Sequence, residues 1–137
     1  MGSLDDLKIL DFSTLLPGPY ATLMLADMGA EVLKISSASR PDIVLDYPPF
    51  IGDTGVSASQ AWLGRNKKTM FLNLKTGEGK AVVKELVKEY DIVLEQFRPG
   101  VMEKLGLGYE DLKAVNPKLI YCSLTGYGQT GPLRDAA

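Results

Sequence analysis

Blocks of apolar residues alternate with polar turns along the chain, and their spacing predicts strands and helices in succession. A short β-rich run at 8–12 precedes a Pro-Gly-Pro turn at 17–19. A helix-length apolar segment follows and leads to a second apolar run at 31–35. This order is typical of a βαβ unit. Gly29 stands where a helix often has its C-cap glycine, so we expect the first helix to end there.

The same alternation continues after residue 67. The run "KTMFLNL" predicts a third strand from Lys68 to Leu74. A helix-period segment from Gly77 to Tyr90 follows, with Thr76 as its N-cap. Its buried stripe is expected to contain Ala81, Val82, Val83, Leu86 and Val87. The last predicted elements are a fourth strand in "DIVLEQF", short helices in "RPGVMEKLG" and "YEDLKAVN", and a fifth strand in "KLIYCSLTG".

Strands that alternate with helices predict an α/β domain with an open, mostly parallel sheet. The length of 137 residues and the apolar fraction of 45% suit one domain with a real core. The segment "SSASRPDIVLDYPPFIGDTGVSASQAW" predicts a long irregular excursion, because it is rich in Pro, Gly, Ser and Asp. Ligands of such sheets bind at the carboxyl ends of the strands. We therefore expect a site among the segments 13–18, 36–40, 73–75, 96–98 and 125–129.

The turn after the first strand lacks the dinucleotide fingerprint. That fingerprint needs three glycines in the turn and an acidic residue at the end of the second strand. Only Gly18 stands in this turn, and Ser36 and Ser37 occupy the place of the acid. NAD is therefore disfavoured. The one argument for NADP is that the Arg40 side chain could bind its 2′-phosphate.

Composition and net charge limit the partners and the catalytic groups that this chain can have. The formal charge of −2, from 15 basic and 17 acidic residues, gives no footprint for nucleic acid or an anionic membrane. Neither a secretory signal nor a membrane span is evident, so a cytoplasmic location is expected. The chain has no histidine and a single cysteine, Cys122, which we expect to be a buried core thiol. Asp11 and Asp27 are expected in turn and capping roles, so no catalytic residue and no metal site are predicted.

Basic residues gather near the ends of the predicted strands. Lysine offers a phosphate a point charge and arginine offers a bidentate fork, so such a set favours a ligand with several phosphates. The alternative interpretation is that these residues form solvated surface. They are Lys75, Arg98 and Lys104, with Arg65, Lys67 and Lys68 close to the third strand.

Three blocks of the sequence are distinctive: "ILDFSTLLPGPYATLMLADMGAEVLKI", "GRNKKTMFLNLKTGEGK" and "VLEQFRPGVMEKLGLG". Together they closely resemble the family III coenzyme A transferases of the CaiB/BaiF type, a group that includes formyl-CoA transferase, carnitine CoA-transferase and α-methylacyl-CoA racemase. The wording "VMEKLGLG" and "GYGQTGP" is most similar to the racemase branch. The resemblance covers nearly the whole chain. It implies a Rossmann-like sheet that belongs to a larger enzyme forming an interlocked homodimer.

The resemblance also implies the position of a coenzyme A site. The turn of Leu15, Leu16 and Pro17 would lie against coenzyme A without cradling a phosphate. The nucleotide site would be lined by Leu72, Asn73, Leu74, Lys75, Gln96, Phe97, Arg98 and Lys104. Two departures stand out, since Gln96 replaces the usual Asn, and Ser36 and Ser37 replace an acidic residue followed by Arg or Pro. Only Arg40 is then left to serve the adenine or phosphate end.

Family members are roughly three times this length by domain count. Their catalytic groups, an aspartate nucleophile in transferases or a His/Asp pair in racemases, follow the point where this chain stops. Residues 1–137 are therefore expected to form the N-terminal CoA-binding part of an enzyme, inactive alone. The enzyme would transfer CoA between carboxylates or racemise 2-methylacyl-CoA by abstracting the proton α to the thioester.

An alternative is a stand-alone, non-catalytic module that binds CoA or a nucleotide. In either case acyl-CoA is the expected small-molecule partner, bound as a substrate and not as a permanent cofactor. Neither nucleic acid nor a membrane is an expected partner.

Overall fold

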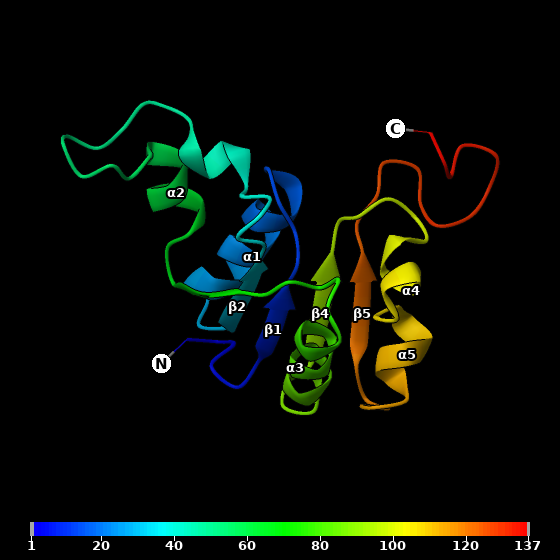
Figure 1. Ribbon diagram of the computed structural model, residues 1–137. Coiled ribbons are helices and arrows are strands. Elements are labelled where there is room, and N and C mark those ends of the chain that lie inside the picture. The colour runs from blue at the N-terminus through cyan, green and yellow to red at the C-terminus, as the bar shows by residue number, and fades with distance from the viewer. Residues whose placement is uncertain (1, 137) are drawn as a thin grey trace.

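A single five-stranded sheet organises the computed structural model, which describes residues 2–136 (Figure 1). Its order is β3-β2-β1-β4-β5, and every neighbouring pair is parallel. This is the strand order of doubly wound dinucleotide-binding folds, so the predicted α/β class is confirmed. The strands are β1 (Lys8–Asp11), β2 (Glu31–Ser36), β3 (Lys67–Phe71), β4 (Ile92–Glu95) and β5 (Ile120–Ser123).

Helices cover both faces of this sheet. They are α1 (Pro17–Asp27), α2 (Ala58–Leu63), α3 (Gly77–Val87), α4 (Val101–Leu105) and α5 (Tyr109–Lys113), with a 3₁₀ turn η1 (Ile43–Asp46). Figure 1 shows α3 in front of the strands, with α4 and α5 beside β5. Within residues 2–136, no helix is both long and apolar enough to cross a membrane.

The core divides into two apolar clusters, one on each face. Leu10 of β1 packs with Val83 and Val87 of α3, whereas Ile9 packs with Ala26 of α1. Successive residues of a strand point to opposite faces, so four residues of β1 supply both clusters. The sheet thus fixes the place where β1, β2, β3 and β4 end, which is the edge that carries the candidate site.

The third helix confirms its predicted N-cap but corrects its predicted buried face. The Gly79 amide donates to the Thr76 hydroxyl at 3.1 Å, as the capping pattern predicts. Val83 and Val87 are fully buried, but Ala81 and Val82 are exposed. Ala81 and Val82 lie on the outer side because only one side of α3 faces the sheet. Apolar residues thus occur on both sides of this helix.

The excursion after β2 is more regular than predicted. Asp42 caps η1 by accepting the Val44 amide, and Ser57 caps α2 by accepting the Gln60 amide at 2.9 Å. Both elements are shorter than two turns, too short for hydrophobic periodicity to reveal them. In the sequence, only their N-cap residues, Asp42 and Ser57, indicate these two elements.

Cys122 is exposed, so its expected place in the core is wrong. It lies on β5, the outermost strand, where exposure alternates along the chain. Tyr121 points to the face that carries α5 and stacks edge-on with Tyr109. Cys122 and the 60% exposed Ile120 point to the other face. An apolar run on an edge strand therefore did not mean burial on both sides.

Candidate functional site

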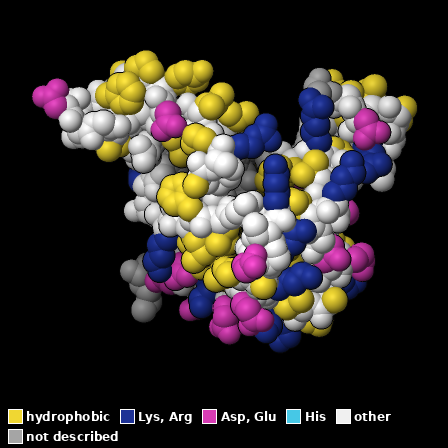
Figure 2. All heavy atoms as spheres, viewed as in Figure 1, with side chains coloured by type: hydrophobic (Ala, Val, Ile, Leu, Met, Phe, Trp, Pro, Cys, Tyr) yellow, Lys and Arg dark blue, Asp and Glu magenta, His cyan; other side chains and the backbone are white. Residues whose placement is uncertain are grey.

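A cavity of about 530 Å³ opens where β1 to β4 end, and it is called the strand-end cavity below. Small-molecule pockets measure roughly 300–1,000 Å³, so the size suits a ligand. Figure 2 shows this edge of the molecule hollowed between two lobes, with Lys and Arg side chains gathered around the hollow. The lining comes from the end of β2, the loops after β1 to β4, η1 and α4. Its residues are Phe12, Thr14 and Leu15; Ile35 to Ser37 and Ser39 to Ile43; Leu72 to Lys75; and Phe97, Arg98, Val101 and Leu105.

The structure brings most of the predicted site residues into this one cavity. Those in its lining are Leu15, Arg40, Leu72, Asn73, Leu74, Lys75, Phe97 and Arg98. The other four lie outside the lining. Leu16 and Pro17 begin α1, Gln96 supports the start of that helix, and Lys104 is exposed on α4. β3 ends at Phe71, three residues before its predicted end, and this early end frees Leu72 to Leu74 to line the cavity.

Three cations surround the strand-end cavity without a carboxylate partner. Arg40, Lys75 and Arg98 come from the loops after β2, β3 and β4, and all three are exposed. Within the described part of the chain, none of them forms an ion pair. Their charges are therefore available to an anionic ligand.

The basic residues near β3 are occupied, so their predicted place in an anion-binding set is wrong. Arg65 forms an ion pair with Asp27. Lys68 lies 3.4 Å from Glu31, and Lys67 lies 3.7 Å from Asp11. Each acid is more than 35 residues away in the sequence, which is why local spacing did not reveal the pairs. Asp27 correspondingly serves Arg65 and does not cap α1.

A second cavity of about 510 Å³ lies beside β2 and β3, under η1 and α2. Its lining includes Gln60, Thr69 and Phe71. The lysines and the arginine in its wall are Lys34, Lys67 and Arg65, and each is in an ion pair. This cavity therefore offers no free cation to an anionic ligand.

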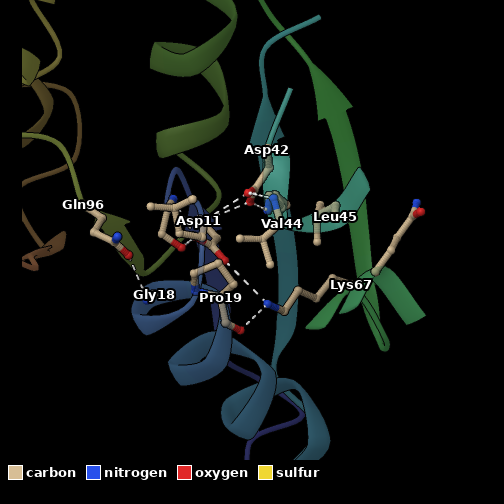
Figure 3. A network of polar contacts seen from close by, with 12 residues as sticks. Asp11, Gly18, Pro19, Asp42, Val44, Leu45, Lys67 and Gln96 are labelled. Atoms are coloured by element: carbon tan, nitrogen blue, oxygen red, sulfur yellow. Dashed lines mark hydrogen bonds and ion pairs between the residues drawn. The ribbon is translucent and has the colours of Figure 1, made fainter. Parts of the chain in front are cut away.

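The turn between β1 and α1 already has acceptors for its amides. The Leu15 amide donates to both carboxylate oxygens of Asp42 at 3.1 Å, and the Gly18 amide donates to Oε1 of Gln96 at 2.9 Å. Dinucleotide-binding folds use free amides at this helix N-terminus to hold the pyrophosphate. Here side chains occupy them (Figure 3). The helix N-terminus is thus not a phosphate cradle, in line with the missing glycines.

A buried polar network supports the same turn from below (Figure 3). Asp11 is fully buried and accepts the Ser13 amide at 2.8 Å and the hydroxyls of Ser13 and Thr22. Its role in a turn is as expected. Lys67 donates to the carbonyl of Pro19 at 2.6 Å and to Thr22 at 2.8 Å. Burial lowers the pKa of Lys67 to about 8, although the nearby Asp11 charge opposes that shift.

The turn after β4 is held in a similar way. Glu95 is buried at the end of the strand, and it accepts the Phe97 amide at 2.8 Å. Burial raises the pKa of this carboxyl, and its hydrogen bonds oppose the rise. Two buried carboxylates, Asp11 and Glu95, therefore fix the two loops that flank the switch point of the sheet. Phe97 and Arg98 reach the cavity from the second of these loops.

The lining defines what the cavity can do chemically. Cations, serine hydroxyls and the Asn73 amide can bind phosphates, while Phe97 and the aliphatic residues can pack against an apolar or planar group. The one carboxylate in the lining, Asp42, is paired with Lys34 at 2.9 Å. The groups in the lining suit binding of an anionic ligand, and the lining contains no unpaired carboxylate.

Asp42 and Lys34 are the residues that sequence reasoning missed. The available signal was a lysine inside the apolar run "EVLKI", because a charge in a buried strand needs a partner.

Comparison with known proteins gives a consistent result along the chain. The model of CoA-transferase family III matches residues 4–137. Acetyl-CoA:oxalate CoA-transferase of Acetobacter aceti is 42% identical over 132 residues, which is 96% of this chain and 33% of the relative. Human succinyl-CoA:glutarate CoA-transferase is 42% identical over 135 residues, which is 98% of this chain and 30% of the relative. The chain therefore spans about a third of the length of these relatives.

Solved structures show the same fold. A CaiB/BaiF family protein from Brucella suis superposes with a TM-score of 0.92 and 40% identity, over 99% of this chain and 36% of that one. A protein from Mycobacterium tuberculosis superposes with a TM-score of 0.87 and 37% identity, over 98% of this chain and 37% of that one.

Proposed function

Because this chain belongs to CoA-transferase family III, we propose that its strand-end cavity binds the nucleotide part of a coenzyme A thioester. The observation that carries the proposal is the set of unpaired cations, Arg40, Lys75 and Arg98, around one cavity. Coenzyme A bears a diphosphate and a 3′-phosphate, which such cations bind well. Phe97 and the aliphatic lining provide a surface for its adenine and its apolar parts.

The remaining site residues follow from the same arrangement. Leu15, Leu16 and Pro17 contact coenzyme A through their side chains, because the amide of Leu15 and that of Gly18 are already bound by side chains. Lys104 lies about one helical turn beyond Val101 on α4, and it extends the positive surface beyond the cavity rim. Gln96 acts indirectly, since it holds the start of α1.

For the whole protein we propose transfer of CoA between carboxylates, with acyl-CoA as substrate. The two relatives named above are CoA-transferases, which favours transfer over racemisation of 2-methylacyl-CoA. The 137 residues would contribute the CoA-binding part of that enzyme. The other candidate, a stand-alone, non-catalytic module that binds CoA or a nucleotide, would use the same cavity, and the transferase relatives do not favour it.

Calorimetric titration with coenzyme A tests the proposal. Arg98→Ala removes a charge-assisted contact, so we expect the binding free energy to weaken by about 1–3 kcal/mol. Arg65→Ala is the matched control, because it removes the same charge from an arginine that is already paired with Asp27. Unchanged affinity in Arg98→Ala, or an equal loss in both variants, would refute the assignment.

A further inference from the structure

Asp42 is an unusual charge for a loop residue. Its side chain is 3% exposed, and it forms an ion pair at 2.9 Å with Lys34, whose side chain is 6% exposed. Lys34 belongs to β2, a central strand, so the loop is tied directly to the sheet. A buried charge is tolerated only when it is paired and its remaining hydrogen-bonding capacity is used.

The rest of that capacity is used on the turn after β1. Both carboxylate oxygens of Asp42 accept the Leu15 amide at 3.1 Å. Leu15 has a φ of 61°, a left-handed conformation that a leucine rarely adopts. Such backbone strain persists only where the surroundings fix it, and it is common at ligand sites.

Asp42 also holds the other wall of the cavity. Its Oδ1 accepts the Val44 amide and so caps η1. The first residue of η1, Ile43, lines the strand-end cavity, as Leu15 does. One carboxylate therefore joins two walls, the turn at 13–16 and the loop at 37–46. Figure 3 shows the Asp42 carboxylate close to Val44, with dashed lines to the polar atoms that it contacts.

We propose that Asp42 is a positioning residue for the coenzyme A site. Anchored by Lys34, it keeps Leu15 in its left-handed conformation and fixes the loop that carries Ile43 and Arg40 before the ligand arrives. A wall that is ordered in advance saves the ligand the entropy cost of ordering it. This inference rests on the proposed function of the cavity, and it assigns Asp42 no direct contact with the ligand.

The test uses coenzyme A titrations of Asp42→Asn and of Asp46→Asn, which removes the same charge from an exposed carboxylate of the same loop. We expect Asp42→Asn to raise the Kd for coenzyme A about tenfold, because the lost anchor must be replaced by ordering on binding. Asp46→Asn should leave the Kd within about twofold of the wild type. Equal affinities in Asp42→Asn and the wild type would overturn the role of Asp42.

The variant Leu15→Gly separates a positioning role of Asp42 from a general loss of stability. Glycine adopts a φ near 60° without strain, so Leu15→Gly removes the conformation that Asp42 has to enforce. In that background Asp42→Asn should weaken binding by less than about threefold. An equal loss in both backgrounds would show that Asp42 does not act through the conformation of Leu15 and would overturn the inference that it positions this turn.

Fold and ligand binding are checked separately. Asp42→Asn should keep a dispersed amide NMR spectrum while the Cα and Cβ shifts of Leu15 leave the left-handed range. If it does not fold, Lys34→Met/Asp42→Asn replaces it, because that variant leaves no lone buried charge, and the same loss of affinity is expected.

Failure of the wild type to bind coenzyme A would refute the proposed function. Unaltered Leu15 shifts would refute the role of Asp42 independently of any ligand.

Discussion

At the scale of single residues, the charges of this molecule fall into two groups that the sequence does not distinguish. Arg40, Lys75 and Arg98 are exposed at the strand-end cavity, whereas Lys34 and Lys67 are buried in ion pairs. The place of Lys75 and Arg98 could be predicted, because strand ends follow from the hydrophobic pattern. The buried pairs could not, because their partners approach only when β2, β3 and the excursion are packed together.

Burial of Lys67 predicts a specific pH dependence of stability. Its pKa is lowered from 10.5 to about 8 by burial. Between these two values the unfolded chain binds more protons at this residue than the folded chain, so its contribution to stability rises with pH across the window. The contribution is fully present above 10.5 and is lost as the pH falls through 8.

Urea unfolding of the wild type and of Lys67→Met at several pH values measures this contribution. The difference between their free energies of unfolding should rise by about 3 kcal/mol from pH 8 to pH 10.5, since one pKa unit corresponds to about 1.4 kcal/mol. Other lysines and the tyrosines titrate in both proteins and cancel in the difference. Parallel curves across this window would show that Lys67 keeps an ordinary pKa.

At the scale of elements, the sequence predicted what periodicity and capping encode. The five strands, α1 and α3 lie close to the positions that the hydrophobic pattern predicted, and Thr76 caps α3 as expected. The short elements η1 and α2 could not be predicted because they contain too few residues to show a period. The exposure of Cys122 escaped it because an apolar run does not reveal whether a strand is central or at the edge.

Helix α1 carries apolar residues on its outer side as well as on the side that faces the sheet. Leu16, Tyr20, Met24 and Met28 recur every four residues and are 41–50% exposed. Trp62 of α2 adds to this strip, with its ring 5.8 Å from that of Tyr20. A contiguous apolar strip on the surface favours association with a partner.

We therefore predict that the chain self-associates through α1, most simply as a two-fold dimer. Light scattering over a dilution series, with a hydrophobic dye as a probe, measures this. Met24→Lys should shift the mass toward the monomer, and Val82→Lys on the exposed side of α3 is the control that should not. A wild-type mass of one chain at high concentration, without dye binding, would contradict the prediction.

At the scale of the whole molecule, the strand-end cavity combines cations with no unpaired carboxylate in its lining. The chain has no histidine, and the one carboxylate in the lining of the strand-end cavity is paired with Lys34. We predict that the 137 residues neither transfer CoA to a carboxylate nor exchange the proton α to the thioester. Deuterium uptake at the α-carbon above the buffer rate, or formation of a new thioester, would contradict this.

The central claim is that coenzyme A binds where β1 to β4 end. Amide NMR of the isotope-labelled chain during a coenzyme A titration tests it most directly. We expect the largest shift changes at Leu15, Asn73, Lys75, Phe97 and Arg98. Gln60, Thr69 and Phe71 of the second cavity should be little affected. Changes centred on the second cavity, or a spectrum that coenzyme A leaves unchanged, would contradict it.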